Sequence, residues 1–299
     1  ISDEKNDWLV DLKNEPINYK NNINGKLETS TGVLIIGHDN AGYTVGEINS
    51  FISKLKWPVI AENPISFPQA LPHAVLYLSD PKIRQVLAPE NIIVIGRTTL
   101  SRSTNEFIKL AKNLTVIDPR IADVDNNRQA DLLVKSLPID VVSESTSIDI
   151  WQKSSDLAAI EIKKLVWSEQ AAIKCICESL TSMSALFVGS SRPVRDIEAF
   201  TKFQTGVFVF ANRGLAGIDG NISTVFGIAK KYQVTNAIMG DLTFLHDISA
   251  LTNSSKENLR IFVIDNNGGG IFSTLPQAGS TGFEQVFGTP HNLDLVKVI

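Results

Sequence analysis

The chain has 299 residues, of which 43% are hydrophobic and 20% charged, an ordinary globular composition long enough for two domains. A formal net charge of -4 offers no basic footprint for nucleic acid, and no stretch approaches the roughly 18 unbroken apolar residues of a membrane span. The two cysteines, Cys175 and Cys177, lie on a predicted helix and suit neither a disulfide framework nor a zinc site, so a cytoplasmic, reducing location fits best.

The two ends of the chain differ from the rest. Residues 1–27 are polar and rich in Asn and Lys, and we interpret them as a linker from an upstream domain. The sequence starts at Ile1 without an initiator Met and stops at Ile299, just after a new apolar segment begins. We therefore expect a fragment that is truncated at its C-terminus.

Strands and helices alternate over residues 28–142, the first predicted α/β domain. Such alternation predicts a mainly parallel sheet with helices on both faces. A Ser-rich, acidic segment at 141–149 interrupts the pattern and is a plausible linker. The expected strands are 32–37, 57–62, 91–96 and 114–119, and the expected helices are 45–55, 81–87 and 104–112.

The alternation resumes in the second predicted domain, residues 150–299. A long helical region at about 150–182 comes first, and four strands follow, each leading into a loop and a helix. The predicted fold class is therefore α/β, with two successive three-layer domains built on mainly parallel sheets. The expected strands are 185–189, 206–211, 237–240 and 260–265.

A Gly-Asp pair and an Asn-rich turn follow two successive strands of this second domain. Asp241 ends the first strand, residues 265–270 end the second, and the segment between them has the apolar spacing of a helix. In a strand–helix–strand unit the strands are parallel and both turns leave the same carboxyl edge, so Asp241 and Asn266 should face one volume. Asp and Asn are common turn residues, and only their spacing and context favour an Mg²⁺ site that holds a diphosphate.

Arginines follow two other strands at the same predicted edge. Arg213 lies in "ANRGLAGIDG", where three glycines in seven residues let the backbone approach a ligand, and Arg195 lies in "GSSRPVRD". Two guanidinium groups there would suit carboxylate substrates, although a charged side chain facing water is the simpler alternative. Ser190 or Ser191 is expected to cap a helix rather than to act as a nucleophile.

The pattern of Gly-Asp, about 25 residues, Asn-Asn, glycine and an apolar pair resembles the diphosphate-binding motif of thiamine-diphosphate enzymes. Four segments are similar to one branch of these enzymes, the 2-succinyl-5-enolpyruvyl-6-hydroxy-3-cyclohexene-1-carboxylate synthases, or MenD family. The segments are "NRGLAGIDG", "GDLTFLHD", "NNGGGIFSTLPQ" and "FGTPHNLD". The resemblance is strong over 185–299. Over 28–142 it covers only the pattern and short pieces such as "GRTTLSR".

The resemblance implies a cofactor site for thiamine diphosphate. Asp241, Asn266 and the Gly268 carbonyl would hold Mg²⁺ or Mn²⁺ on the diphosphate, with Thr243 beside the phosphates. Ile218 would be the apolar wedge that bends the cofactor. The remaining implied residues, which would wall the pocket, are Ile271, Phe272 and Leu275.

The implied reaction is a transferase reaction of menaquinone biosynthesis. Thiamine diphosphate supplies the electron sink for decarboxylation of 2-oxoglutarate, and the succinyl carbanion equivalent adds to isochorismate. Ser191, Arg195 and Arg213 match positions that face the substrates, and Arg102 would approach the second substrate from the central domain. Both substrates carry carboxylates, which gives the arginines a role.

The chain departs from this family in one respect that affects activity. The family's activating glutamate lies on a pyrimidine-binding domain that should precede Ile1, so the fragment is expected to be inactive alone. The family also implies a homodimer or homotetramer. Two alternatives remain open: another thiamine-diphosphate enzyme, such as a 2-oxoacid decarboxylase or an acetolactate-synthase-like enzyme, and a non-catalytic module that keeps the fold.

Overall fold

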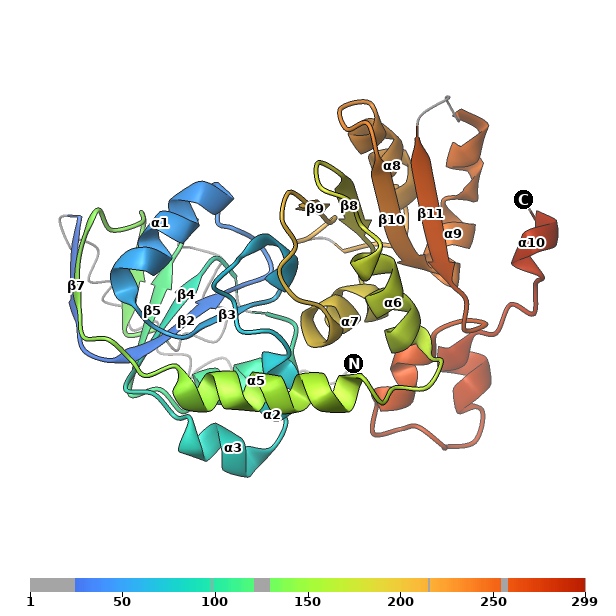
Figure 1. The fold of residues 1–299 in the computed structure, drawn as a ribbon. Helices are drawn as coiled ribbons and strands as arrows, with labels where there is room; N and C mark the ends of the chain where they lie inside the picture. Colours follow the sequence, from blue (N-terminus) through green and yellow to red (C-terminus); the bar gives the residue numbers. More distant parts are fainter. Residues whose placement is uncertain (1–24, 98, 121–129, 215, 254–257, 299) are drawn as a thin grey trace, which may run out of the picture.

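The structure is a computed structural model that describes residues 25–97, 99–120, 130–214, 216–253 and 258–298. Nearly all of the predicted 1–27 linker therefore lies outside the described residues. Two parallel sheets lie side by side, and helices cover both faces of each (Figure 1). The predicted α/β class with three layers and mainly parallel sheets is confirmed.

The first sheet has five strands in the order β3-β2-β4-β5-β6, and every neighbouring pair is parallel. Four of these strands lie where the sequence predicts them, and the short β6 was not predicted. The strands are β2 (Gly32–Ile36), β3 (Val59–Ala61), β4 (Asn91–Ile95), β5 (Asn113–Ile117) and β6 (Leu132–Val134).

A separate two-stranded parallel ladder joins β1 (Lys26–Thr29) to β7 (Asp140–Ser143). β7 overlaps the start of the acidic segment that we interpret as a linker. The ladder therefore brings both ends of the 28–142 region together, while the domain boundaries themselves stay a prediction.

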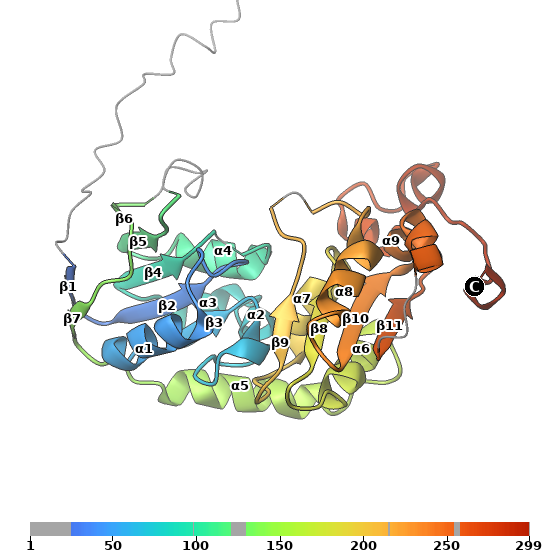
Figure 2. The ribbon, with the colours of Figure 1, turned by 90° about the horizontal axis from the view of Figure 1, so that it is seen from above.

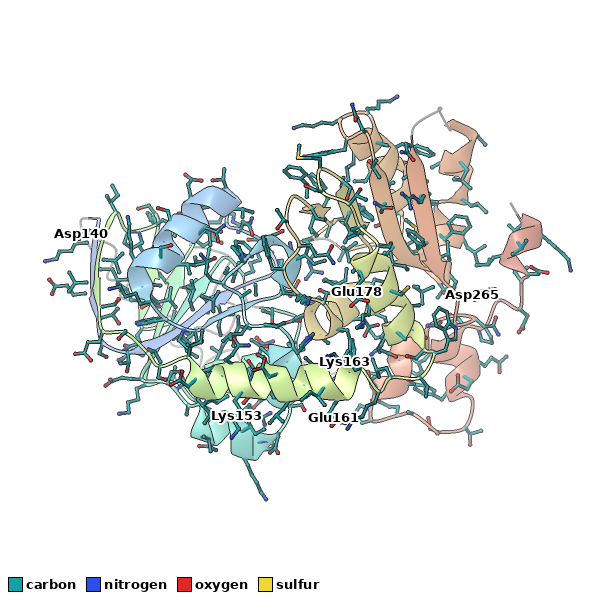
Figure 3. All side chains as sticks on the ribbon, viewed as in Figure 1. Asp140, Lys153, Glu161, Lys163, Glu178 and Asp265 are labelled. Atoms are coloured by element: carbon teal, nitrogen blue, oxygen red, sulfur yellow. The ribbon has the colours of Figure 1, made fainter. Side chains whose placement is uncertain are left out.

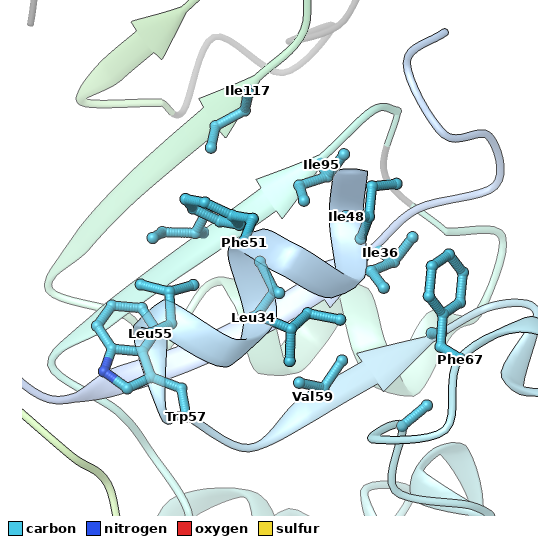
Figure 4. Packing of buried hydrophobic residues seen from close by; sticks show 14 of the residues in the cluster. Leu34, Ile36, Ile48, Phe51, Leu55, Trp57, Val59, Phe67, Ile95 and Ile117 are labelled. Carbon is cyan, nitrogen blue, oxygen red and sulfur yellow. The ribbon is translucent and has the colours of Figure 1, made fainter. Parts of the chain in front are cut away.

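Alternate residues of the central strands point to opposite faces of the five-stranded sheet, as the two-residue period of a strand requires. Leu34 and Ile36 pack against Phe51 of helix α1 (Val45–Leu55), as Figure 4 shows. Val33 and Ile35 lie in the cluster on the other face. All five residues of β2 are buried, as expected for a parallel strand covered on both sides.

Helices also cover the opposite face of this sheet. Phe107 and Trp151, from two of these helices, lie in the same buried cluster. The two rings meet edge to face with centroids 5.6 Å apart. Figures 1 and 2 show the longest of these helices, α5, running along the first sheet and toward the second. The helices of this region are α2 (Ala74–Tyr77), α3 (Pro81–Val86), α4 (Arg102–Ile108) and α5 (Asp149–Ile162).

Helix α1 occupies the predicted residues because its ends carry strong local signals. The Thr44 side chain accepts from the Glu47 backbone N–H, and the Glu47 carboxylate accepts from the Thr44 N–H at 2.8 Å, which is a capping box. Lys56 ends the helix in the left-handed conformation, with φ of 57°. Similar capping by Ser101 begins α4.

The second sheet has four parallel strands in the order β11-β10-β8-β9. One face packs on α6 and α7 and the other on α8 and α9. The strands are β8 (Ala185–Val188), β9 (Phe208–Phe210), β10 (Thr235–Gly240) and β11 (Leu259–Ile264). The helices are α6 (Glu169–Glu178), α7 (Arg192–Phe200), α8 (Asn221–Ala229), α9 (Asp241–His246) and the terminal α10 (Leu295–Val298).

The single helical region predicted over 150–182 is wrong in detail, because the structure divides it into α5 and α6. Ser168 caps a new helix by accepting from the Ala171 N–H at 3.3 Å. Val166, an apolar residue within that predicted region, is 79% exposed between the two helices. A capping signal inside an apolar pattern therefore ended one helix and began another.

Short helical turns complete the described chain: 3-10 turns at Pro64–Ser66, Ile248–Asn253 and Gly270–Thr274, and a π-helical turn at Glu284–Gly288. Cys175 and Cys177 are both free cysteines. Among the described residues, no helix combines the length and the apolar character needed to cross a bilayer.

Candidate metal and cofactor site

The candidate site lies at the carboxyl edge of the four-stranded sheet. β10 and β11 are parallel neighbours with Gly240 opposite Ile264, so Asp241 and Asp265 leave the sheet side by side. Figure 3 shows Asp265 at the end of β11, next to the C-terminal segment. The predicted adjacency of the two turns is confirmed.

Asp241 is the centre of the site and is only 2% exposed. Its Oδ1 accepts from the Leu242 N–H at 2.7 Å, and its Oδ2 accepts from the backbone N–H groups of Gly268 at 2.7 Å and Asn266 at 3.2 Å. The structure therefore brings together Asp241, Asn266 and Gly268, because the second turn wraps around the first carboxylate.

The second turn depends on glycine at position 268. Gly268 has φ of +135°, a conformation that side chains rarely adopt, and a Cβ there would lie 2.2 Å from the Gly288 carbonyl oxygen. The next residue, Gly269, donates its N–H to the same Gly288 oxygen at 2.6 Å. The turn is thus clamped against residues 288–289 of the C-terminal segment.

His291 enters the site from that segment, and the sequence analysis missed it. Its Nε2 lies 3.2 Å from Asp241 Oδ2 and 3.6 Å from Asp265 Oδ1. Asn292 accepts from the Asn267 side chain at 3.0 Å and donates its N–H back to Asn267 Oδ1 at 2.7 Å, which fixes the segment. No spacing rule links a histidine to an aspartate 50 residues away.

The side chains present fit a divalent cation. One ligand atom each from Asp241, Asp265 and His291 lies within 4.8 Å of the others. The Asn266 amide extends from the same turn, since its backbone N–H already contacts Asp241. Carboxylate and amide oxygens suit Mg²⁺, and an imidazole widens the range toward Mn²⁺ and softer ions.

The other predicted cofactor residues differ in burial. Thr243 lies in the first turn of α9 and is 8% exposed. Ile218 lies in the loop before α8 and is 42% exposed, and Phe272 is 40% exposed in the 3-10 turn after Gly269. Ile271 and Leu275 are half-buried beside Phe272. Phe272 lies beside the second turn, where its N–H donates to the Gly269 carbonyl, and an exposed apolar side chain there is suited to contact a ligand.

Arg213 points into the junction of the two sheets. Its Nη2 donates to Glu62 Oε1 at 2.8 Å, and both side chains are nearly buried. The Arg213 Nε is buried without a hydrogen-bond partner in the described part of the chain. Arg213 and Glu62 border a cavity of about 940 Å³ between the sheets.

Arg195 and Ser191 lie together at the start of α7. The Arg195 Nη1 donates to the Ser191 carbonyl at 2.7 Å. Ser191 occupies the N-cap position with φ of 72°. Its side chain makes no capping hydrogen bond, so the predicted cap is correct in position but not in its bonding. A non-glycine residue held in this region is strained, and such strain is concentrated at functional sites.

Four charged groups form a cluster on this side of the site: Glu62, Glu198, Arg195 and Arg213. Burial raises the pKa of Glu198 well above its usual range, and the nearby Glu62 raises it further. Burial lowers the pKa of Arg195, which Glu62 opposes. The cluster therefore leaves the two guanidinium groups incompletely neutralised and able to receive a carboxylate.

Arg102 lies apart from this cluster. It is the first residue of α4, it is exposed, and it is not among the residues that line the cavity between the sheets. Glu62 nevertheless connects to its loop, because Glu62 Oε2 accepts from the Leu100 N–H at 3.0 Å.

No protein-family model matches the chain. Three curated proteins of one name are similar to it: the 2-succinyl-5-enolpyruvyl-6-hydroxy-3-cyclohexene-1-carboxylate synthases of Lysinibacillus sphaericus, Thermobifida fusca and Staphylococcus haemolyticus. They are 31%, 31% and 30% identical over 90%, 89% and 97% of this chain. The chain is a partial-length relative of these synthases. It spans about half of each synthase, namely 54%, 51% and 56% of their length.

Proposed function

We propose that this chain is the central and diphosphate-binding part of a thiamine-diphosphate-dependent 2-succinyl-5-enolpyruvyl-6-hydroxy-3-cyclohexene-1-carboxylate synthase. The complete enzyme would decarboxylate 2-oxoglutarate and add the succinyl group to isochorismate. The observation that carries the proposal is the convergence of both turns on Asp241 in a chain related to synthases of that name. Residues 28–142 would form the central domain and 150–299 the diphosphate-binding domain.

In this proposal, Asp241, Asn266 and the Gly268 carbonyl hold Mg²⁺ or Mn²⁺, and Thr243 lies beside the phosphates. When bound, thiamine diphosphate supplies the electron sink for loss of carbon dioxide. Asp241 is suited to its part because its carboxylate is already oriented by three backbone N–H groups.

The apolar residues and the arginines shape the rest of the proposed pocket. Ile218 supports the bent cofactor, and the wall residues Ile271, Phe272 and Leu275 exclude water from it. Arg213 and Arg195 bind substrate carboxylates, with the unpaired Arg213 Nε as an available donor. Ser191 contacts a substrate next to Arg195, and Arg102 approaches the second substrate. The enzyme would act in the cytoplasm as a homodimer or homotetramer.

Cofactor binding is tested by calorimetric titration of thiamine diphosphate with Mg²⁺ into the native chain and an Asp241→Ala variant. We expect binding to the native chain and none to the variant, because the cation loses its buried carboxylate. An Asp294→Ala variant is the control, since Asp294 is exposed and its side chain contacts Lys297 and the Val296 N–H in the described chain, outside the site. Equal binding by native chain and Asp241→Ala would refute the metal assignment.

Substrate choice is tested in the complete protein by measuring carbon dioxide release from 2-oxoglutarate with and without isochorismate. We expect isochorismate to be consumed with the release. A preference for pyruvate and indifference to isochorismate would favour another 2-oxoacid decarboxylase or an acetolactate-synthase-like enzyme. No release from any 2-oxoacid, with intact cofactor binding, would favour a non-catalytic module.

A further inference from the structure

The side-chain amide of Asn266 is held from a distant helix. Its Nδ2 donates to Glu169 Oε1 at 3.1 Å, across 97 residues of sequence. Glu169 is the first residue of α6, which packs on the face of the sheet opposite α8 and α9. A residue outside both metal-binding turns therefore contacts the side chain of a proposed metal ligand.

This contact decides which end of the amide faces Glu169. An ionised carboxylate has no hydrogen to donate, so it can only face the NH₂ group of Asn266. The oxygen, Oδ1, is then on the opposite branch of the amide. Only that oxygen can coordinate a cation, because an amide NH₂ offers no lone pair to a metal.

Glu169 is itself well fixed. Ser168 caps α6 through the Ala171 N–H, and Ile173 and Cys177 anchor the helix in the core beneath β8 and β10. A carboxylate in the first turn of a helix is also favoured by the positive end of the helix dipole. Glu169 is therefore held by the scaffold rather than by a flexible loop.

We propose that Glu169 is a positioning residue of the metal site, which orients the Asn266 amide so that its oxygen faces the cation held by Asp241. This inference rests on the proposed function, because it requires a cation at these two residues. Without Glu169 the amide would rotate freely between two orientations, one of which presents hydrogens to the metal. Partners that orient metal ligands typically change metal affinity by 10–100-fold when removed.

The first test measures Mn²⁺ binding to the full chain in the presence of thiamine diphosphate. Electron paramagnetic resonance detects the bound Mn²⁺. We expect Glu169→Ala to weaken Mn²⁺ binding about tenfold or more. Glu169→Gln should weaken Mn²⁺ binding less than Glu169→Ala does, since the glutamine amide oxygen still accepts from Asn266 Nδ2. The matched control is Glu178→Ala at the other end of α6, where Glu178 forms an ion pair with Lys174 away from the site and no weakening of Mn²⁺ binding is expected.

The second test removes the need for orientation. In an Asn266→Asp background both side-chain oxygens are equivalent, so Glu169→Ala should cause no further loss of Mn²⁺ affinity and should raise it by removing a repelling charge. An equal loss in the native and Asn266→Asp backgrounds would overturn the inference, because a merely structural role predicts it. Urea unfolding of each variant checks that the fold persists, and Glu169→Gln serves if Glu169→Ala does not fold.

The outcomes separate the inference from the function on which it rests. If the native chain binds Mn²⁺ with thiamine diphosphate and neither Glu169 variant weakens binding, Glu169 is not a positioning residue while the proposed function stands. If the native chain binds neither Mn²⁺ nor cofactor, the proposed function falls and the inference falls with it.

Discussion

Arg213 and Glu62 form a nearly buried ion pair across 151 residues of sequence, with Arg213 Nη2 2.8 Å from Glu62 Oε1. The second Glu62 oxygen accepts from the Leu100 N–H at 3.0 Å. One carboxylate thus joins the end of β3, the loop before α4 and the loop after β9. The ion pair therefore fixes the Arg213 side chain and links the two sheets.

Glu62→Ala is expected to destabilise the chain by about 3 kcal/mol, because it leaves the Arg213 guanidinium buried and unpaired. The free energy of unfolding in urea measures this. The double variant Glu62→Ala/Arg213→Ala should cost less than the sum of the single changes. The control is Glu161→Ala, whose pair with Lys164 is exposed, so little change is expected. Strict additivity of Glu62 and Arg213 would contradict the pair.

Gly268→Ala is expected to damage the cofactor site more than the fold. The new Cβ would lie 2.2 Å from the Gly288 oxygen, and alanine would have to adopt a positive φ. The strained φ alone should lower the free energy of unfolding by about 1–3 kcal/mol. We expect cofactor affinity with Mg²⁺ to fall in calorimetric titration. Gly227→Ala in α8, where nothing lies within 4 Å of the added Cβ, should instead be neutral or stabilising.

Cofactor and metal together should stabilise the native chain. At thiamine diphosphate about 100-fold above its Kd, mass action adds roughly 3 kcal/mol, which corresponds to a rise of several degrees in Tm. Calorimetric melting with Mg²⁺, with Mg²⁺ removed by a chelator, and with Asp241→Ala measures the effect. We expect the rise only in the first case. A rise that persists after chelation would contradict binding through a metal.

Asp196 should make stability depend on pH. Burial raises its pKa to about 6 despite Arg192 at 3.1 Å, so the folded state binds a proton that the unfolded state releases above about pH 4. The free energy of unfolding should therefore fall as pH rises from about 4 to 6, by up to roughly 3 kcal/mol for this group.

Asp196→Asn should remove this fall, so that the variant is more stable than the native chain at pH 7 and not at pH 4. Urea unfolding across this range gives the comparison. Asp156→Asn on the exposed face of α5 is the control and should leave the pH profile unchanged. A native profile identical to that of Asp196→Asn would contradict the shifted pKa.

Local sequence signals predicted much of the fold. The apolar runs of β2, β4 and β10, and the capped α1, lie within a few residues of their predicted positions because their hydrophobic periods agree with their caps. The short β6 and the β1–β7 ladder were missed: β6 has only three residues, and β1 (KLET) and β7 (DVVS) carry few apolar residues and lie in segments whose composition indicates linkers.

The candidate site was predictable only where its residues share a turn or a strand–helix–strand unit. Asp241 and Asn266 satisfied that condition through the parallel pairing of β10 and β11. Glu62, Glu169 and His291 reach the site from other elements, and their placement depends on how sheets and segments pack. No spacing along the chain encodes such contacts, so the sequence could not reveal them.

The position of β11 has a consequence for handling the protein. It is the outer strand of its sheet, it is six residues long, and its apolar side chains are only half-buried. Such a strand presents unpaired backbone groups on which another chain can add a strand. The opposite edge, β9, has three residues and packs beside the Pro64–Ser66 turn. Self-association of this chain should therefore begin at β11 and increase with concentration.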